Sequence, residues 1–178
     1  MILEKNILSK SECDLFIERA TLKGFKNSLI GDGNENSNIR TSYEVNLDID
    51  DVVGNLLLNK LNEFNITSLP KYLKVIKYTK GSFFKKHKDT YDDIKNRKRY
   101  KTMVLQLSNT ADYQGGDLRV YTDLSNDIYF PISRQQGSVS IFPSDFTHEV
   151  LEIIDGIRYT IVMWLESDNF DSNKKILI

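Results

Sequence analysis

From residue 72 onward, short runs of β-forming residues alternate with turn signals. Six runs are rich in Val, Ile, Tyr and Phe, and they read YLKVIKYT, KTMVLQLS, DLRVYTD, IYFPIS, SVSIFP and RYTIVMWL. Many of them alternate apolar with polar positions, and segments such as DYQGGD and RQQGS separate them. This pattern predicts many closely spaced strands.

The first third of the chain has helical periodicity instead. Ser9 and Glu12 have the spacing of a capping box, and a helical pattern follows from Leu15. A second helix is predicted from about 51 to 64, because one face of that segment is apolar: Val53, Leu57, Leu61 and Phe64. Residues 24–42 are rich in Gly, Asn and Ser, which turn easily and bury little, and they predict a mobile surface segment.

Helices followed by many strands predict an α+β protein that is mainly β, with the helices packed outside a β-sandwich or barrel. The helical part is expected at about 1–70 and the β core at about 71–166. No repeat, low-complexity tract or proline-rich linker divides the sequence, so the whole chain, 1–178, is expected to form a single domain.

The composition is that of an ordinary globular protein. Hydrophobic residues make up 40%, charged residues 28%, and the net charge is -1, which excludes a disordered chain and binding of polyanions by bulk charge. The lone Cys13 cannot form an internal disulfide and is expected in the core. The start, MILEKNILSK, lacks the apolar run of a signal peptide or membrane span, which predicts a cytoplasmic protein that does not associate with membranes.

The chain has only two histidines, and one of them has a carboxylate two residues away. Within FKKHKDT, His87 and Asp89 would project to the same side of an extended strand and could face one point. This spacing alone is weak evidence, because aspartate is frequent in the chain.

The other histidine, His148, follows the strand-like run SVSIF. Two strands could therefore bring it beside His87 and Asp89. Two histidines and one carboxylate form the facial triad of non-haem Fe(II) oxygenases, which leaves the opposite coordination positions open. Zinc can use the same ligands with water as a fourth.

An arginine begins the last strand-like run. Arg158 and Thr160 would share one face of RYTIVMWL with Val162 and Trp164. An inward-facing arginine on an apolar strand is costly unless it meets an anion, and its planar fork suits a carboxylate. A metal with open positions and a nearby carboxylate clamp are what a dicarboxylic keto acid requires.

Three segments together resemble the iron- and 2-oxoglutarate-dependent dioxygenases. They are YTKGSFFKKHKD, LQLSNTADYQGGDLRVY and GSVSIFPSDFTHEVLEIIDGIRYTIVMWL. The matched order is a tyrosine, a glycine, an aromatic, HxD, a GG turn, FP, a histidine, and then a glycine and an arginine. The resemblance is to the prolyl 4-hydroxylase-like branch, near its PKHD-type members, and LSKSECDLFIERA also resembles this branch. It implies a double-stranded β-helix of the jelly-roll, cupin-like type.

The resemblance assigns roles to individual positions. It implies that His87, Asp89 and His148 hold Fe(II), and that Arg158 binds the distal carboxylate of 2-oxoglutarate. Tyr78 matches a tyrosine that can hydrogen-bond this cosubstrate, although packing inside the barrel explains it equally well. Thr160 could assist Arg158 or could be a plain strand threonine.

Two positions differ from parts of the family. Prolyl 4-hydroxylases usually carry lysine where this chain has Arg158, but PKHD-type members carry arginine. Gln106 stands where oxygen-sensing relatives have a tyrosine that contacts 2-oxoglutarate. Gln106 could replace that tyrosine as a hydrogen-bond donor, or it could simply line the pocket.

The resemblance also implies a reaction. It would use O2 to decarboxylate 2-oxoglutarate to succinate and CO2 while it hydroxylates an unactivated C–H bond, with ascorbate as a further implied cofactor. The substrate would be a protein side chain such as proline, or a small molecule.

Two features bear on the substrate. Residues 93–101, DIKNRKRYK, could attract an acidic peptide, a nucleotide or a nucleic acid, but a solvated hairpin loop is the commoner reason for such a charge run. Nearby aromatic residues could stack on a substrate, although most aromatic residues in β-folds pack in the core; they are Phe83, Phe84, Tyr91 and Tyr100.

Two other functions stay open at this point. A nucleic-acid demethylase of the same chemistry would need a basic groove and a base-flipping pocket, which the net charge of -1 does not favour. A non-catalytic β-helix binding module could keep the ligand set without turnover. A serine hydrolase is disfavoured because no GxSxG motif surrounds Ser138, Ser140 or Ser144. The sequence does not set the oligomeric state.

Overall fold

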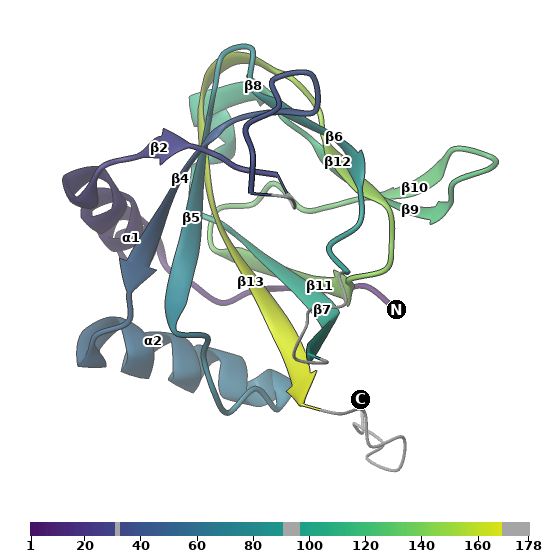
Figure 1. Cartoon of the computed structure of the whole chain (residues 1–178). Coiled ribbons are helices and arrows are strands. Elements are labelled where there is room, and N and C mark those ends of the chain that lie inside the picture. Colours follow the sequence, from purple (N-terminus) through teal and green to yellow (C-terminus); the bar gives the residue numbers. More distant parts are fainter. Residues whose placement is uncertain (31–32, 91–96, 169–178) are drawn as a thin grey trace.

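The computed structural model describes residues 1–30, 33–90 and 97–168. Within these ranges, two antiparallel sheets face each other, and the two α-helices cover the outer side of the larger sheet (Figure 1). The fold is therefore the predicted jelly-roll: mainly β, with N-terminal helices outside a double-stranded β-helix.

The larger sheet has seven strands in a continuous path and an eighth attached to its side within the described residues. Its order is β1 (Leu3–Asn6), β11 (Ser138–Pro143), β7 (Arg97–Gln106), β13 (Ile153–Asp168), β5 (Tyr72–Thr79), β4 (Tyr43–Asp48) and β2 (Lys26–Asn27), and β8 (Tyr113–Gly115) pairs with β13. The smaller sheet has the order β10 (Ile128–Pro131), β9 (Leu118–Asp123), β12 (His148–Val150), β6 (Phe83–His87) and β3 (Arg40–Thr41).

Both predicted helices are present. Helix α1 (Lys10–Lys23) begins with a complete capping box: the Ser9 hydroxyl accepts a hydrogen bond from the Glu12 N–H, and the Glu12 carboxylate accepts one from the Ser9 N–H. Helix α2 (Asp51–Leu61) continues into the 3-10 helix η1 (Asn62–Phe64), and a second 3-10 helix, η2 (Thr110–Asp112), precedes β8. Together α2 and η1 match the predicted helical segment.

Two hydrophobic cores lie on opposite sides of the larger sheet. The outer core joins the helices to this sheet through Cys13, Phe16, Ala20, Val45, Leu47, Val53, Leu57, Leu61, Leu73, Val75, Met103, Leu105, Ile161 and Met163. The inner core lies between the sheets and contains Ile76, Tyr78, Val104, Tyr113, Leu118, Val120, Phe142, Val150 and Ile153. The predicted alternation along the last strand is confirmed, and burial raises the pKa of the Cys13 thiol to about 11, as expected for a core residue.

The part expected to be helical, at about 1–70, contains both α-helices and also four short strands, β1 to β4. Most described residues of the segment 24–42 are exposed or half-buried, as expected of a surface segment, but its ends form β2 and β3 and bury Ser28, Arg40 and Ser42. Ser42 bonds to Ser28 at 2.9 Å and accepts from the Arg40 guanidinium at 2.8 Å. These hydrogen bonds pair the buried hydroxyls of Ser28 and Ser42 with each other and with the Arg40 Nε, and the Arg40 Nη2 lies 3.7 Å from the Glu44 carboxylate. Residues 31–32 lie outside the described ranges.

The basic run at 93–101 differs from the predicted solvated loop. Residues 91–96, with Tyr91, lie outside the described ranges, and from Arg97 onward the run forms strand β7. The Arg99 guanidinium lies 3.9 Å from the centre of the Trp164 ring, which explains how this cation is accommodated on a strand. No helix among the described residues is long and apolar enough to cross a membrane.

Candidate metal centre

Neighbouring strands of the smaller sheet bring the two histidines together. Strands β6 and β12 pair with His87 opposite His148, and the centres of the two rings are 4.1 Å apart. Asp89 lies two residues beyond the end of β6, and its backbone N–H donates to the Ser144 carbonyl at 3.0 Å. The three residues therefore do meet, although His87 and Asp89 do not share one continuous strand as predicted.

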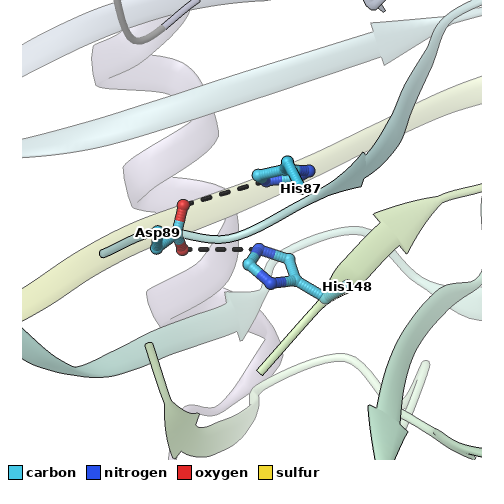
Figure 2. Close-up of side chains that lie close together, drawn as sticks. All are labelled: His87, Asp89 and His148. Atoms are coloured by element: carbon cyan, nitrogen blue, oxygen red, sulfur yellow. Dashed lines mark ion pairs between the residues drawn. The ribbon is translucent and has the colours of Figure 1, made fainter. Parts of the chain in front are cut away.

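The three side chains converge on one point between the sheets (Figure 2). The Asp89 carboxylate reaches both imidazoles, with Oδ1 3.8 Å from His87 Nε2 and Oδ2 3.4 Å from His148 Nε2. One ligand atom from each residue lies within 4.8 Å of the others. Two nitrogens and one carboxylate oxygen at this spacing can hold a divalent metal on one face.

Backbone carbonyls set the orientation of both imidazoles. The Nδ1 atom of His87 lies 2.7 Å from the Lys85 carbonyl oxygen, and the Nδ1 atom of His148 lies 3.0 Å from that of Phe146. A carbonyl oxygen only accepts hydrogen bonds, so each Nδ1 carries the hydrogen in the neutral ring. Each Nε2 then presents its lone pair to the shared point, as a metal ligand requires.

The ionisation states of His87 and Asp89 suit a cation. Burial lowers the pKa of His87 to about 4, and the nearby His148 adds to this effect. Burial opposes a charged His148, but the Asp89 carboxylate outweighs it and raises the pKa of His148. Burial likewise opposes an ionised Asp89, yet contact with the two imidazoles prevails and holds the pKa of Asp89 below its ordinary value. A neutral His87 and an anionic Asp89 are the forms that bind metal.

A threonine that the sequence analysis missed positions the carboxylate. The Thr102 hydroxyl donates to Asp89 Oδ2 at 2.8 Å, and it lies 3.0 Å from the Ser144 hydroxyl. The alternation in KTMVLQLS gave a signal, since it places Thr102 on the same strand face as Gln106. Nothing in the sequence alone pairs Thr102 with Asp89.

Removal of the Thr102 hydroxyl should weaken metal binding. In Thr102→Val the carboxylate loses its hydrogen-bond donor at nearly constant volume, and we expect the dissociation constant for Fe(II) to rise about tenfold, as for other partners of metal ligands. Anaerobic titration calorimetry measures this change. Thr122→Val, at an exposed site on β9, should leave the constant unchanged, and an equal loss in both variants would contradict the positioning role.

A column of stacked side chains covers one side of the His87 ring. The Phe84 ring stacks on the His87 ring with the ring centres 3.5 Å apart, and the Arg40 guanidinium lies over the Phe84 ring, 4.7 Å from its centre. Of the aromatic residues predicted near the site that the structure describes, Phe84 is the one whose ring stacks on a candidate ligand. Register explains the contact with Arg40, because Arg40 lies opposite Phe84 in the pairing of β3 with β6.

Arg158 lies buried on the inner face of the larger sheet. Only 2% of its surface is exposed, its Nε donates to Gln106 Oε1 at 3.3 Å, and its guanidinium lies 5.4 Å from the centre of the Tyr78 ring. Its Nη1 atom is buried and has no hydrogen-bond partner among the described residues. A buried guanidinium with an unused donor is a site for an anion.

The other residues predicted to bind the cosubstrate lie around Arg158. Tyr78 and Thr160 are buried. Tyr78 lies opposite Arg158 in the pairing of β5 with β13. Thr160 lies opposite Gln106 in the pairing of β7 with β13. The GG turn also contributes, since a Cβ added to Gly116 would lie 2.2 Å from Ile153 Cδ1 and 3.4 Å from Arg158 Cδ. Glycine at this turn, with φ of +67°, lets the chain pack closely against Ile153 beside the arginine.

Strand β7 links the metal centre to the anion site. Thr102, which contacts Asp89, and Gln106, which contacts Arg158, lie on the same face of β7 four residues apart. At about 3.3 Å per residue, this separates them by about 13 Å along the strand. A short dicarboxylate and the side chains that face it can bridge this distance, so the residues present fit both a divalent metal and a keto diacid that chelates it.

The chain is similar to known oxygenases. Residues 73–166 match the model of the 2OG-Fe(II) oxygenase superfamily. A PKHD-type hydroxylase of Synechococcus sp. (strain CC9311) is 35% identical over 77 residues, which cover 43% of this chain and 34% of the relative. The match thus spans 34% of the length of this relative and 28% of that of a PKHD-type hydroxylase of Rippkaea orientalis.

Solved structures share the fold. A Pseudomonas putida prolyl-4-hydroxylase superposes with a TM-score of 0.69 at 17% identity, covering 92% of this chain and 90% of that one. A Trichoplax adhaerens prolyl hydroxylase, in complex with a peptide fragment of hypoxia inducible factor, gives 0.73 at 17% identity, covering 92% and 82%. With more than half of its residues matched by the family model, the chain belongs to the 2OG-Fe(II) oxygenase superfamily.

Proposed function

We propose that the protein is an Fe(II)- and 2-oxoglutarate-dependent dioxygenase that hydroxylates an unactivated C–H bond. The observation that carries this proposal is the convergence of His87, Asp89 and His148, together with the unused donor of Arg158 on the inner face of the larger sheet. Membership of the superfamily supports the same conclusion.

In this proposal each group of residues has its own task. His87, Asp89 and His148 hold Fe(II) through two Nε2 atoms and one carboxylate oxygen. The bound iron supplies the O2 chemistry that converts 2-oxoglutarate to succinate and CO2 and places one oxygen atom on the substrate carbon. Thr102 keeps the carboxylate in position through its hydrogen bond to Asp89.

The anion site orients the cosubstrate. Arg158 donates from Nη1 to the distal carboxylate of 2-oxoglutarate, while its Nε stays bound to Gln106. Gln106 thereby fixes the guanidinium, and the Tyr78 ring supports it from one side. Thr160, which lies opposite Gln106 on the neighbouring strand, completes the polar surface. This clamp leaves the keto-acid end to face the metal.

The proposed substrate is a peptide or protein side chain, with proline as the first candidate. The relatives named as PKHD-type hydroxylases and the prolyl hydroxylases of the same fold support this choice. The Trichoplax neighbour was solved with a peptide bound, which supports a substrate of this kind.

Two signals test the proposal. Anaerobic addition of Fe(II) and 2-oxoglutarate to the purified protein should produce a visible charge-transfer absorption, which omission of either component should remove. Admission of O2, with ascorbate present, should then release succinate slowly even without a substrate. If the protein binds both ligands but releases no succinate, it is a binding module rather than an enzyme.

A further inference from the structure

The side chains of Arg40, Phe84 and His87 form a column that ends at a candidate metal ligand. We propose that Arg40 is a positioning residue of the metal centre, which acts on His87 through the Phe84 ring. This inference rests on the proposed function, because it takes His87 as a ligand of the metal. A bulge in β6, the stacking of the two rings and the anchored guanidinium carry it.

The bulge in β6 places Phe84 beside His87. Two residues three positions apart on a regular strand lie on opposite faces of the sheet. In the pairing of β6 with β12, His87 lies opposite His148. Phe84 lies opposite Val150, so three steps along β6 match two steps along β12. The extra residue in β6 turns Phe84 and His87 to the same face, where their ring planes differ by only 16°.

The stacked ring fixes what the hydrogen bond of His87 leaves open. Nδ1 of His87 lies 2.7 Å from the Lys85 carbonyl oxygen, which holds one atom of the imidazole. A single hydrogen bond leaves the plane of the ring free to tilt, because the torsion that turns an imidazole has a broad minimum. The Phe84 ring, 3.5 Å away and nearly parallel, restricts that plane. Nε2 is thereby held toward Asp89 and His148, as a metal ligand requires.

The guanidinium of Arg40 is anchored outside the metal centre. Its Nε donates to the Ser42 hydroxyl at 2.8 Å, and its Nη1 donates to the Leu29 carbonyl oxygen at 3.0 Å. Only 8% of Arg40 is exposed, and the guanidinium carbon lies 4.7 Å from the centre of the Phe84 ring. Two hydrogen bonds and burial make the planar guanidinium a fixed support for the ring. Without this support, the Phe84 ring is held less firmly against His87.

A purely structural role for Arg40 is the alternative. Its Nη2 lies 3.7 Å from the Glu44 carboxylate, and both residues are buried. Loss of one partner of a buried ion pair lowers stability whether or not the metal is affected. A loss of metal affinity in one variant therefore does not separate the two roles. Energetic coupling between Arg40 and Phe84 does separate them, because only the positioning role requires the ring.

The test is a double-mutant cycle on metal binding. Phe84→Leu removes the flat ring and keeps an apolar side chain, and Arg40→Met removes the guanidinium. We expect each variant to raise the dissociation constant for Co(II) about tenfold, as for other partners of metal ligands. If Arg40 acts through the ring, the double variant loses no more affinity than Phe84→Leu alone. Titration with Co(II) alone measures these constants, and the visible d–d absorption of the bound ion should shift in both variants, because it reports coordination geometry.

Two further variants are matched controls. Phe83→Leu makes the same change at the neighbouring half-buried position of β6. Arg119→Met removes an arginine whose guanidinium lies 4.4 Å from the centre of the Tyr129 ring. Both should keep the wild-type constant and the wild-type spectrum. Additive losses in the double variant, an unshifted Co(II) spectrum in Arg40→Met, or equal losses in the controls would overturn the proposal.

Circular dichroism and thermal melting check that the variants fold. If Arg40→Met does not fold, Arg40→Lys takes its place in the cycle, because it keeps a cation beside Glu44 and lacks the planar fork. A wild-type protein that binds no Co(II) would remove the metal assignment, and the proposed function would fail with it. Wild-type affinity in both column variants would leave the proposed function intact and remove only the role of Arg40.

Discussion

We expect the replacement of His148 by alanine to abolish Fe(II) binding and, with it, the turnover of 2-oxoglutarate. His148 supplies one of three converging ligand atoms, and its Nε2 lies 3.4 Å from the carboxylate oxygen of Asp89. Loss of an outer partner of a ligand already weakens metal affinity by about 10- to 100-fold. Loss of the ligand itself should therefore raise the dissociation constant by more than about a hundredfold.

The dissociation constants for Fe(II) are measured by anaerobic titration calorimetry of the wild-type and variant proteins. His148 is buried at the start of β12, so the variant must be shown to fold, and its circular dichroism and melting temperature serve that purpose. Val150→Ala, at a buried position on the same strand, is the matched control. It should lower the melting temperature and keep Fe(II) affinity. A folded His148→Ala protein with wild-type affinity would remove the metal assignment.

The sequence predicted those parts of the fold that depend on local pattern. Ser9 and Glu12 lie three residues apart and form the capping box that they predict. The period of two along RYTIVMWL places Ile161 and Met163 in the outer core and Arg158 on the opposite face. These features need only neighbours within one element, so a single sequence contains the necessary information.

The strands that were missed are short or polar. Strands β2 and β3 contain two residues each, too few to display a period. Strand β4 is six residues long and alternates, with Val45 and Leu47 in the outer core, but it lies between a polar segment and a helix. Its pairing with β5 is a tertiary contact, and such contacts override local composition.

The candidate metal cluster could be predicted because histidine is rare in this chain, with only two residues, and because two histidines and one carboxylate carry specific chemistry. Thr102 and Arg40 were missed because common residue types gain their roles from register. Thr102 contacts Asp89 only because the register of β7 in the larger sheet places it there. Arg40 covers Phe84 only because β3 pairs with β6 so that these two residues lie opposite each other. A shift of one residue in either strand would turn these side chains to the opposite face.

Replacement of Arg158 by alanine should separate binding of the cosubstrate from binding of the metal. The guanidinium is buried, and its Nη1 atom has no partner among the described residues, so a carboxylate bound there gains a charge-assisted hydrogen bond away from water. Truncating one partner of such a buried pair costs about 2–5 kcal/mol. We expect the dissociation constant for 2-oxoglutarate to rise by about a hundredfold, equivalent to about 2.7 kcal/mol, while Fe(II) affinity stays within about twofold.

The comparison between two arginines decides whether this loss is specific. Arg119 lies 4.4 Å from the centre of the Tyr129 ring, much as Arg158 lies beside Tyr78, but it belongs to β9 in the smaller sheet. Arg119→Ala removes the same side chain from a similar aromatic contact and should leave 2-oxoglutarate affinity unchanged. Titration of 2-oxoglutarate into the metal-loaded proteins measures both constants. Wild-type affinity in folded Arg158→Ala would show that the distal carboxylate binds elsewhere, because this variant has no guanidinium at position 158.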